Sequence, residues 1–405
     1  MTISYEAPLN EDENTVIKRY LSQLEWNDAL ASEVSAETID LIKAIRKTRR
    51  KPGSLESFFQ QYSLNTEEGL ALMSMAEALL RIPDSHVANK LIRDKIAGTN
   101  WLKNKSDDKD WLTKIAGVGL NISGSTMNSL LSKLGEPVIR EAMVRAMKVL
   151  GKQFVVGETL PKAIKKSKSW EEKGFRFSYD ILGEGARTFK DADYYFQNYK
   201  SALEDLSNNE TATKKNFGIS VKLSALHPRF ELLHTDFCVP YLVDKLTELC
   251  EIASAKNLSF TIDAEEVARI YPTLKVFEGL LEKDFSKWEG LGIAIQAYHK
   301  SAISVIDYVY DIAQSKNKKI QVRLVKGAYW DTEIKHSQIN GHDQYPVFTR
   351  KENSDLSYLL CAQKLFDYAD HIYPMFGTHN AHTVAAIQKM AGKRSFEFQK
   401  LYGMG

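Results

Sequence analysis

The segment Ile320-Gln-Val-Arg-Leu-Val-Lys-Gly-Ala-Tyr-Trp-Asp331 decides the fold of this chain. Every second residue at its start is apolar, and this period of two predicts a β-strand with one apolar face, formed by Ile320, Val322 and Leu324. Arg323, Lys326 and Gly327 then cluster where the strand ends. Because an unpaired buried charge is costly, these cations indicate a binding site. The alternative is an edge strand whose arginine is solvated.

Four other segments combine an apolar face with a polar residue near the end of a predicted strand. They are residues 175–182, 218–225, 259–265 and 292–298, and their polar residues are Asp180, Lys222, Asp263 and Gln296. Segments long enough for a helix lie between them, for example 239–255 and 302–314. Strands that alternate with helices predict βαβ units and a parallel sheet.

Both an open doubly wound sheet and a closed barrel fit this alternation. Central strands of an open sheet are covered on both faces and read as continuous apolar runs. Here only one face is consistently apolar, as expected when the outer face packs on helices and the polar strand ends line one pocket. The sequence therefore favours the α/β class, with a (β/α)8 TIM-like barrel preceded by a helical N-terminal region.

Length and composition bound the organisation of the chain. Because 405 residues exceed what one core usually supports, we expect two parts: a helical arm and linker region over residues 1–170 and a barrel over 171–405. Helices are predicted at 64–80 and 137–150 in the first part. A formal charge of only +2 argues against a dedicated nucleic-acid binder. The three scattered cysteines indicate reduced thiols in a cytoplasmic protein.

Two kinds of short motif carry no site. The pairs Gly117–Gly119 and Gly183–Gly185 lack the third glycine of a dinucleotide fingerprint, so no Rossmann site is expected. His379 and His382 are three residues apart, but no HxxE or CxxC partner flanks them. We therefore expect no metal site.

With these motifs in hand, the sequence resembles the proline dehydrogenase part of the bifunctional proline utilisation A flavoproteins. The matching barrel segments are 177–184, 221–229, 262–266, 295–298, 323–331, 345–351 and 378–382, and three helical segments, 67–73, 76–84 and 153–159, match as well. The resemblance implies a flavoprotein of proline catabolism, with FAD held non-covalently at the C-terminal ends of the barrel strands. It implies oxidation of L-proline to Δ1-pyrroline-5-carboxylate, with hydride passing to FAD N5 and electrons to a membrane quinone.

The resemblance also carries over to single residues. The flavin-binding positions of the family match Gln296, Arg323, Lys326, Gly327, Trp330, Thr349, Lys351, Thr378 and His379, and the substrate positions match Lys222 and Asp263, with Tyr329 and Leu401 walling the pocket. Physical chemistry agrees where it can be applied, since an arginine stabilises the anion that a flavin forms on reduction. Lys222 would help to hold the substrate carboxylate, and Asp263 would orient the amine side.

The end of the sequence departs from the family. Residues 396–405 match the seventh barrel strand and the turn after it, whereas the family continues with a last strand and a helix whose arginine pair clamps the proline carboxylate. We thus expect a C-terminally incomplete barrel that lacks its last βα unit. The alternative to a proline dehydrogenase is a truncated, non-catalytic fragment that binds FAD weakly or acts only as an interaction module. A third reading is an unrelated barrel aldolase with Lys222 or Lys326 as its Schiff-base lysine.

Expectations about partners follow from the same comparison. No basic ribbon-helix-helix region precedes the helical arm, so we expect no nucleic-acid partner. The resemblance implies L-proline and a membrane quinone as partners and a cytoplasmic protein that contacts the inner membrane peripherally. The sequence leaves the oligomeric state open.

Overall fold

The computed structural model describes residues 9, 11–47, 155–181, 183, 185–285 and 287–403. The chain divides into two compact units, of which the first combines Met1–Lys43 with Gly157–Gly405 and the second is Ala44–Val156. Most of the second unit lies outside the described residues, and so do the helices predicted at 64–80 and 137–150. The candidate site belongs to the first unit.

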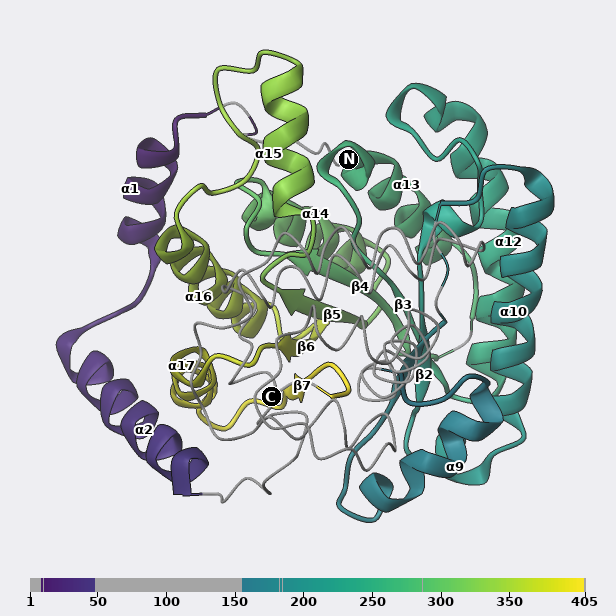
Figure 1. Ribbon diagram of the computed structural model, residues 1–405, viewed down its shortest axis with the longest axis horizontal. Coiled ribbons are helices and arrows are strands. Elements are labelled where there is room, and N and C mark those ends of the chain that lie inside the picture. The colour runs from purple at the N-terminus through teal and green to yellow at the C-terminus, as the bar shows by residue number, and fades with distance from the viewer. Residues whose placement is uncertain are drawn as a thin grey trace, which may run out of the picture. The chain divides into compact units, whose positions relative to one another are not determined.

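A seven-stranded parallel sheet forms the centre of the first unit, with its strands in sequence order (Figure 1). The strands are β1 (Ser178–Asp180), β2 (Gly218–Val221), β3 (Ser259–Ile262), β4 (Leu291–Gln296), β5 (Ile320–Val325), β6 (Ile372–Gly377) and β7 (Glu397–Gln399). Each strand pairs in parallel with the next one along the chain, from β1 to β7. The predicted α/β class with a TIM-like barrel is confirmed, because the structure has a curled parallel sheet built from consecutive βα units.

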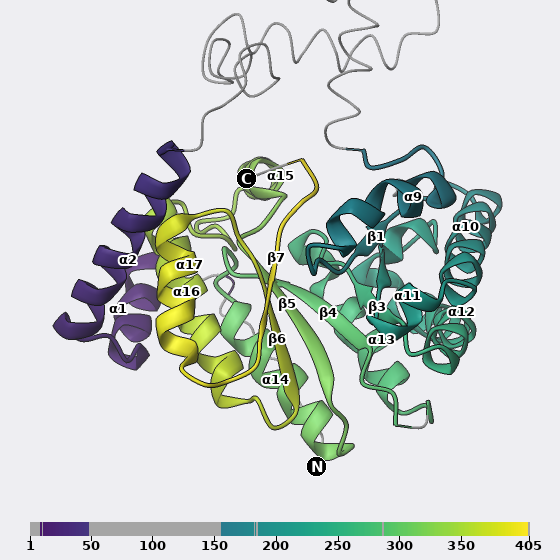
Figure 2. The ribbon, with the colours of Figure 1, turned by 90° about the horizontal axis from the view of Figure 1, so that it is seen from below.

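Helices cover the outer face of the sheet. Those that follow strands are α10 (Phe189–Ser207), α11 (Glu210–Lys214), α12 (Thr235–Ala255), α13 (Ile270–Leu281), α14 (Ala302–Ser315), α15 (Trp330–Ile339), α16 (Lys351–Asp367) and α17 (Ala381–Ala391). Helices α10 and α12 lie outside the early strands and α16 and α17 outside the late ones (Figure 2). Helix α9 (Leu160–Glu171) precedes β1. Helices α10, α12 and α14 contact β2, β3 and β4, and α16 contacts β5 and β6, so their apolar stripes face the sheet.

The predicted strand over 218–225 ends early in the structure. Strand β2 stops at Val221, and Leu223–Ala225 form a buried 3-10 turn. All four residues of β2 and all six of β4 are buried, whereas β5 keeps the predicted alternation of buried and half-buried residues. Helices cover one face of these strands and lumen side chains cover the other, so an alternating sequence does not give an alternating exposure at every strand.

Two N-terminal helices pack on the outside of the late helices (Figure 2). They are α1 (Glu13–Gln23) and α2 (Asp28–Lys47). Val16 and Tyr20 of α1 are buried against Phe348 and Leu360. The Tyr20 hydroxyl donates to the Lys300 carbonyl at 2.9 Å. A buried apolar seam with a satisfied hydroxyl joins α1 firmly to the strand-bearing part of the chain.

Candidate active site at the C-terminal ends of the strands

One side chain joins most of the strands across the inside of the sheet. Arg323 projects from β5, and its guanidinium donates to Asp263 at 2.9 Å and to Ser220 at 2.9 Å. It also donates to Ser178 at 3.1 Å and, through Nε, to Gln399 at 2.7 Å. These partners belong to β1, β2 and β7 and to the residue after β3. A single guanidinium reaches them all because the sheet curls around it, and its planar fork suits this many acceptors.

Asp263 lies between two cations. Its carboxylate accepts from Arg323 at 2.9 Å and from the Lys222 ammonium at 3.2 Å. The side chains of Arg323, Asp263 and Lys222 are only 13%, 16% and 16% exposed. Burial raises the pKa of the Asp263 carboxyl, and the neighbouring cations act in the opposite direction. The cluster satisfies each buried charge with at least one opposite charge.

Lys222 is held in its protonated form. Its ammonium contacts Asp180 at 3.3 Å as well as Asp263. Although burial alone would lower the pKa of Lys222, the two carboxylates raise it above its ordinary value. A Schiff-base lysine must be a neutral amine to attack a carbonyl. The environment of Lys222 therefore favours an anion-binding role over the aldolase reading.

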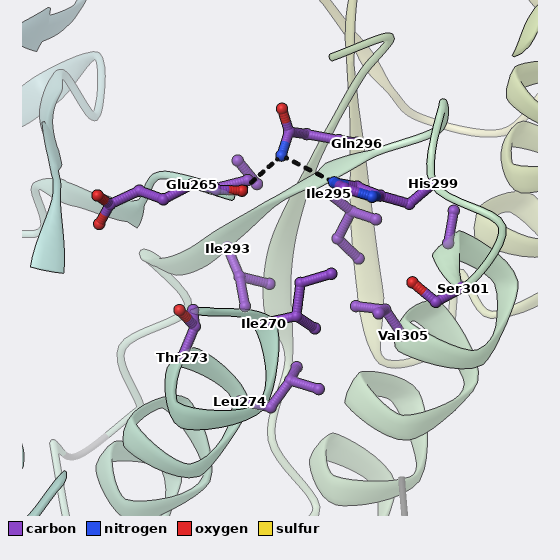
Figure 3. A pocket seen from close by; sticks show the side chains of 13 residues that line it. Glu265, Ile270, Thr273, Leu274, Ile293, Ile295, Gln296, His299, Ser301 and Val305 are labelled. Atoms are coloured by element: carbon purple, nitrogen blue, oxygen red, sulfur yellow. Dashed lines mark hydrogen bonds between the residues drawn. The ribbon is translucent and has the colours of Figure 1, made fainter. Parts of the chain in front are cut away.

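Gln296 at the end of β4 has a fixed orientation. Its Oε1 accepts from the Ala328 N–H at 3.0 Å, and its Nε2 donates to the Glu265 carbonyl at 2.9 Å. A backbone N–H and a backbone carbonyl can be satisfied only by this arrangement of the amide. The Nε2 also lies 3.4 Å from His299 Nε2 (Figure 3). The amide is thereby pinned between the loops that follow β3 and β5.

A cavity lies behind Gln296, between β4 and helices α13 and α14 (Figure 3). It has about 400 Å³ of space between atoms, part of it open to solvent. Its polar lining comes from Glu265, Thr273, Gln296, His299 and Ser301. Within the described chain, His299 Nδ1 and Ser301 Oγ are buried without a hydrogen-bond partner. Burial lowers the pKa of His299 to about 3, so the imidazole is neutral. Lys222, Asp263 and Arg323 do not line this cavity, which is therefore separate from the charged cluster.

A second group of charges lies where β5 ends and α16 begins. Lys326, the residue after β5, and Lys351, the first residue of α16, both donate to the carboxylate of Asp355. Burial would raise the pKa of Asp355, but the two lysines lower it below its usual value. Two ammonium groups against one carboxylate leave a net positive charge at this end of the sheet, which suits an anionic ligand.

Packing against Tyr298 requires a glycine at position 327, one of the expected flavin-binding positions. Gly327 has φ 145°, and a Cβ placed on it would lie 2.2 Å from the ring of Tyr298. The neighbouring Trp330 is 41% exposed and donates through its indole to the Phe348 carbonyl at 2.9 Å. Only glycine tolerates this backbone conformation and this approach of an aromatic ring.

The other expected residues are spread along the same edge. Tyr329 is half-buried, and its N–H donates to the Tyr298 hydroxyl at 3.2 Å. The Thr378 N–H donates to the Gln399 carbonyl at 3.3 Å, and His379 is exposed. Burial lowers the pKa of His379. Leu401 lies beyond β7 and is 66% exposed.

Several residues of this edge were not predicted from the sequence. They are Ser178, Ser220 and Gln399 around Arg323, Asp355 between the two lysines, and Glu13 against Thr349. Asp355 had a local signal, because it lies one helical turn after Lys351 in an i,i+4 pair.

Comparison with known proteins identifies the family. A family model described as proline dehydrogenase matches residues 163–405. The chain belongs to the proline dehydrogenase family. A second model, described as the DNA-binding domain of proline dehydrogenase, matches residues 54–154, all of which lie outside the described residues. This match weighs against the expectation that the protein has no nucleic-acid partner.

The similar proteins agree with this family. The bifunctional protein PutA of Klebsiella aerogenes is 40% identical over 98% of this chain, and that of Rhizobium meliloti is 40% identical over all of it. Proline dehydrogenase 1 of Bacillus subtilis is 25% identical over an alignment that covers 62% of this chain and 74% of that relative. The chain spans about a third of the length of the PutA relatives, 32% and 34% of these two.

Solved structures show the same likeness. A crystal structure of a Bradyrhizobium japonicum proline utilization A (PutA) mutant superposes with a TM-score of 0.75 at 41% identity, covering all of this chain and 42% of the other. Among the helices that the structure describes, none is both long and apolar enough to cross a membrane. The family that the matching model describes is one of oxidoreductases that act on proline.

Proposed function

We propose that this chain is the catalytic part of an FAD-dependent proline dehydrogenase. It oxidises L-proline to Δ1-pyrroline-5-carboxylate in the cytoplasm, with a membrane quinone as the electron acceptor. The observation that carries the proposal is the cluster of Lys222, Asp263 and Arg323, buried together at the C-terminal ends of β2, β3 and β5. Active sites of barrel enzymes lie at this end of the strands.

The charges of the cluster suit an amino acid substrate. The protonated Lys222 presents a cation to the substrate carboxylate, while Asp263 offers an acceptor to the amine side of the ring. Arg323 holds Asp263 in place and keeps a permanent positive charge beside it. Binding thus orients the ring and excludes water from its reacting face, which lowers the entropic part of the barrier.

The residues at the end of β5 fit an anionic dinucleotide cofactor. Lys326 and Lys351 leave a net positive charge around Asp355, and Gln296 presents an oriented amide on the neighbouring strand. When bound, FAD would supply the hydride acceptor that no side chain can provide. The remaining proposed contacts to the cofactor are made by Gly327, Trp330, Thr349, Thr378 and His379. The wall of the substrate pocket is formed by Tyr329 and Leu401.

An anaerobic titration tests the proposal. The purified chain is reconstituted with FAD, free flavin is removed, L-proline is added and the flavin absorbance is followed. We expect L-proline to bleach the bound flavin, D-proline to bleach it far less, and Lys222→Met to retain FAD while requiring much more L-proline. Lys245, a surface lysine on α12 that pairs with Asp193, supplies the matched control Lys245→Met, whose titration should equal that of the wild type.

The outcomes distinguish a catalytic chain from a fragment that only binds flavin. Bleaching of the wild type that Lys222→Met weakens supports both the activity and the assignment of the cluster. Retained flavin without bleaching contradicts catalysis by this chain and leaves it a flavin-binding fragment. If no flavin is retained, the proposed function is wrong for this chain.

A further inference from the structure

The start of helix α16 is capped by a residue from the far end of the chain. The N-cap residue Arg350 makes no side-chain cap of its own. Instead, the carboxylate of Glu13 accepts from the Thr349 N–H at 3.0 Å, from the Thr349 hydroxyl at 2.7 Å and from the Arg350 N–H at 3.4 Å. It also accepts from the Asn353 side chain at 2.6 Å. A helix start with its N–H groups and positive dipole end is a natural place for an anion.

Glu13 is anchored where it stands. It occupies the first turn of α1, whose Val16 and Tyr20 are 0% and 2% exposed. The buried Lys300 ammonium donates to the Glu11 carbonyl at 2.7 Å, and the Lys300 carbonyl accepts from the Tyr20 hydroxyl. If α1 moved away so that Glu13 left α16, a packed apolar seam would be exposed and the buried Lys300 ammonium would lose its hydrogen bond to the Glu11 carbonyl, which is costly.

We propose that Glu13 is a positioning residue for the FAD site: by clamping the start of α16, it places Lys351, and the Asp355 carboxylate that holds both Lys351 and Lys326, so that the lysines can receive the anionic part of the cofactor. This inference rests on the proposed function. Lys351 is the residue after Arg350, and Asp355 lies one turn further along the same helix. Fixing the backbone at 349–350 thus fixes the direction in which both side chains leave the helix.

The alternative is that Glu13 competes with the cofactor for the helix start. The contacts favour positioning. The hydrogen bonds shown for Glu13 go to Thr349, Arg350 and Asn353, while the carboxylate that Lys326 and Lys351 share is Asp355. Burial would raise the pKa of Glu13, but these hydrogen bonds lower it, so the carboxylate is ionised while it caps the helix. If Glu13 competed with the cofactor, its carboxylate would need to leave the start of α16 easily. The buried packing of α1 opposes this movement.

Four variants and two measurements test the inference on the full chain. Glu13→Ala removes the clamp, and Val16→Ala loosens the packing of α1 without touching α16's first turn. Glu33→Gln on α2, a residue 62% exposed and paired with Lys389, is the surface control. FAD affinity is measured by titration of the apoprotein, and amide hydrogen exchange at residues 349–350 is measured without FAD.

We expect Glu13→Ala to weaken FAD binding about tenfold or more, the value of one or two charged hydrogen bonds, and to speed exchange at 349–350. Glu13→Gln, which keeps one acceptor oxygen, should lie between Glu13→Ala and the wild type. Val16→Ala should lower the melting temperature yet keep FAD affinity within about twofold, because it retains the charged hydrogen bonds of the clamp.

Two results would overturn the inference. One is tighter FAD binding in Glu13→Ala and Glu13→Gln, which would show competition. The other is an equal loss of affinity in Glu13→Ala and Val16→Ala, or no loss in either, which would leave Glu13 a structural cap only. A wild-type chain that binds no FAD contradicts the proposed function instead, and the exchange measurement still reports on the clamp.

Discussion

Replacing Asp263 by asparagine should destabilise the protein far more than an ordinary polar substitution. Asp263 is the carboxylate between Arg323 at 2.9 Å and Lys222 at 3.2 Å, and all three side chains are at least four-fifths buried. At an effective dielectric constant of about 20, each of these contacts corresponds to an attraction of about 5–6 kcal/mol, most of which offsets desolvation. Removing the charge leaves the buried Arg323 guanidinium without a carboxylate partner and Lys222 with Asp180 alone.

We therefore expect Asp263→Asn to lower the free energy of unfolding by about 3–5 kcal/mol, the usual cost of breaking a buried ion pair from one side. Asp180→Asn is the matched control, because Asp180 also contacts Lys222 but is 46% exposed. Its substitution should cost about 0–1 kcal/mol. Urea denaturation at neutral pH, followed by circular dichroism, measures both.

A double-mutant cycle sharpens the test. Adding Lys222→Met to Asp263→Asn removes a buried cation that has lost its more buried carboxylate partner, and it should recover about 1 kcal/mol or more of the loss. The reasoning fails if Asp263→Asn costs no more than Asp180→Asn. It also fails if Lys222→Met destabilises the wild type and the Asp263→Asn variant equally, because the pair would then be uncoupled.

Three further predictions concern the same end of the sheet. Since burial holds the pKa of His299 at about 3, below the ordinary 6.5, the unfolded chain takes up the proton first as the pH falls. Between pH 7.5 and 5.5 the wild type should lose about 1.4 kcal/mol more stability than His299→Asn in urea titrations. Gly327→Ala should lower the free energy of unfolding by about 2–4 kcal/mol, because it strains the backbone and places a Cβ against Tyr298. Gly341 also has a positive φ, +65°, but open space around it, so Gly341→Ala should cost about 1–2 kcal/mol. Thermal melts compare the two variants. Arg323→Lys keeps the charge but cannot reach all four acceptors at once, so it should lower stability by about 2–3 kcal/mol, whereas full stability would show that the fork is dispensable.

The order of strands and helices was predictable because each is a local pattern. The period of two at 320–325 and the helical segments between strands depend only on neighbouring residues, and the structure has β5 at Ile320–Val325 and α14 at Ala302–Ser315. The meeting of Lys222, Asp263 and Arg323 was also predictable in outline, because the C-terminal ends of parallel strands share one edge. The ends of strands were less predictable, since β2 stops at Val221 where the chain turns into a 3-10 segment.

By itself, then, the sequence determined the class of fold, the edge of the sheet that carries the charges and the family. Only the tertiary structure decided which side chains become partners. Arg323 contacts Gln399 because the sheet curls until β5 and β7 share one lumen, and Glu13 caps α16 across 336 positions of the chain because α1 packs on that helix. Such contacts depend on closure and side-chain reach, which residues near in sequence do not encode.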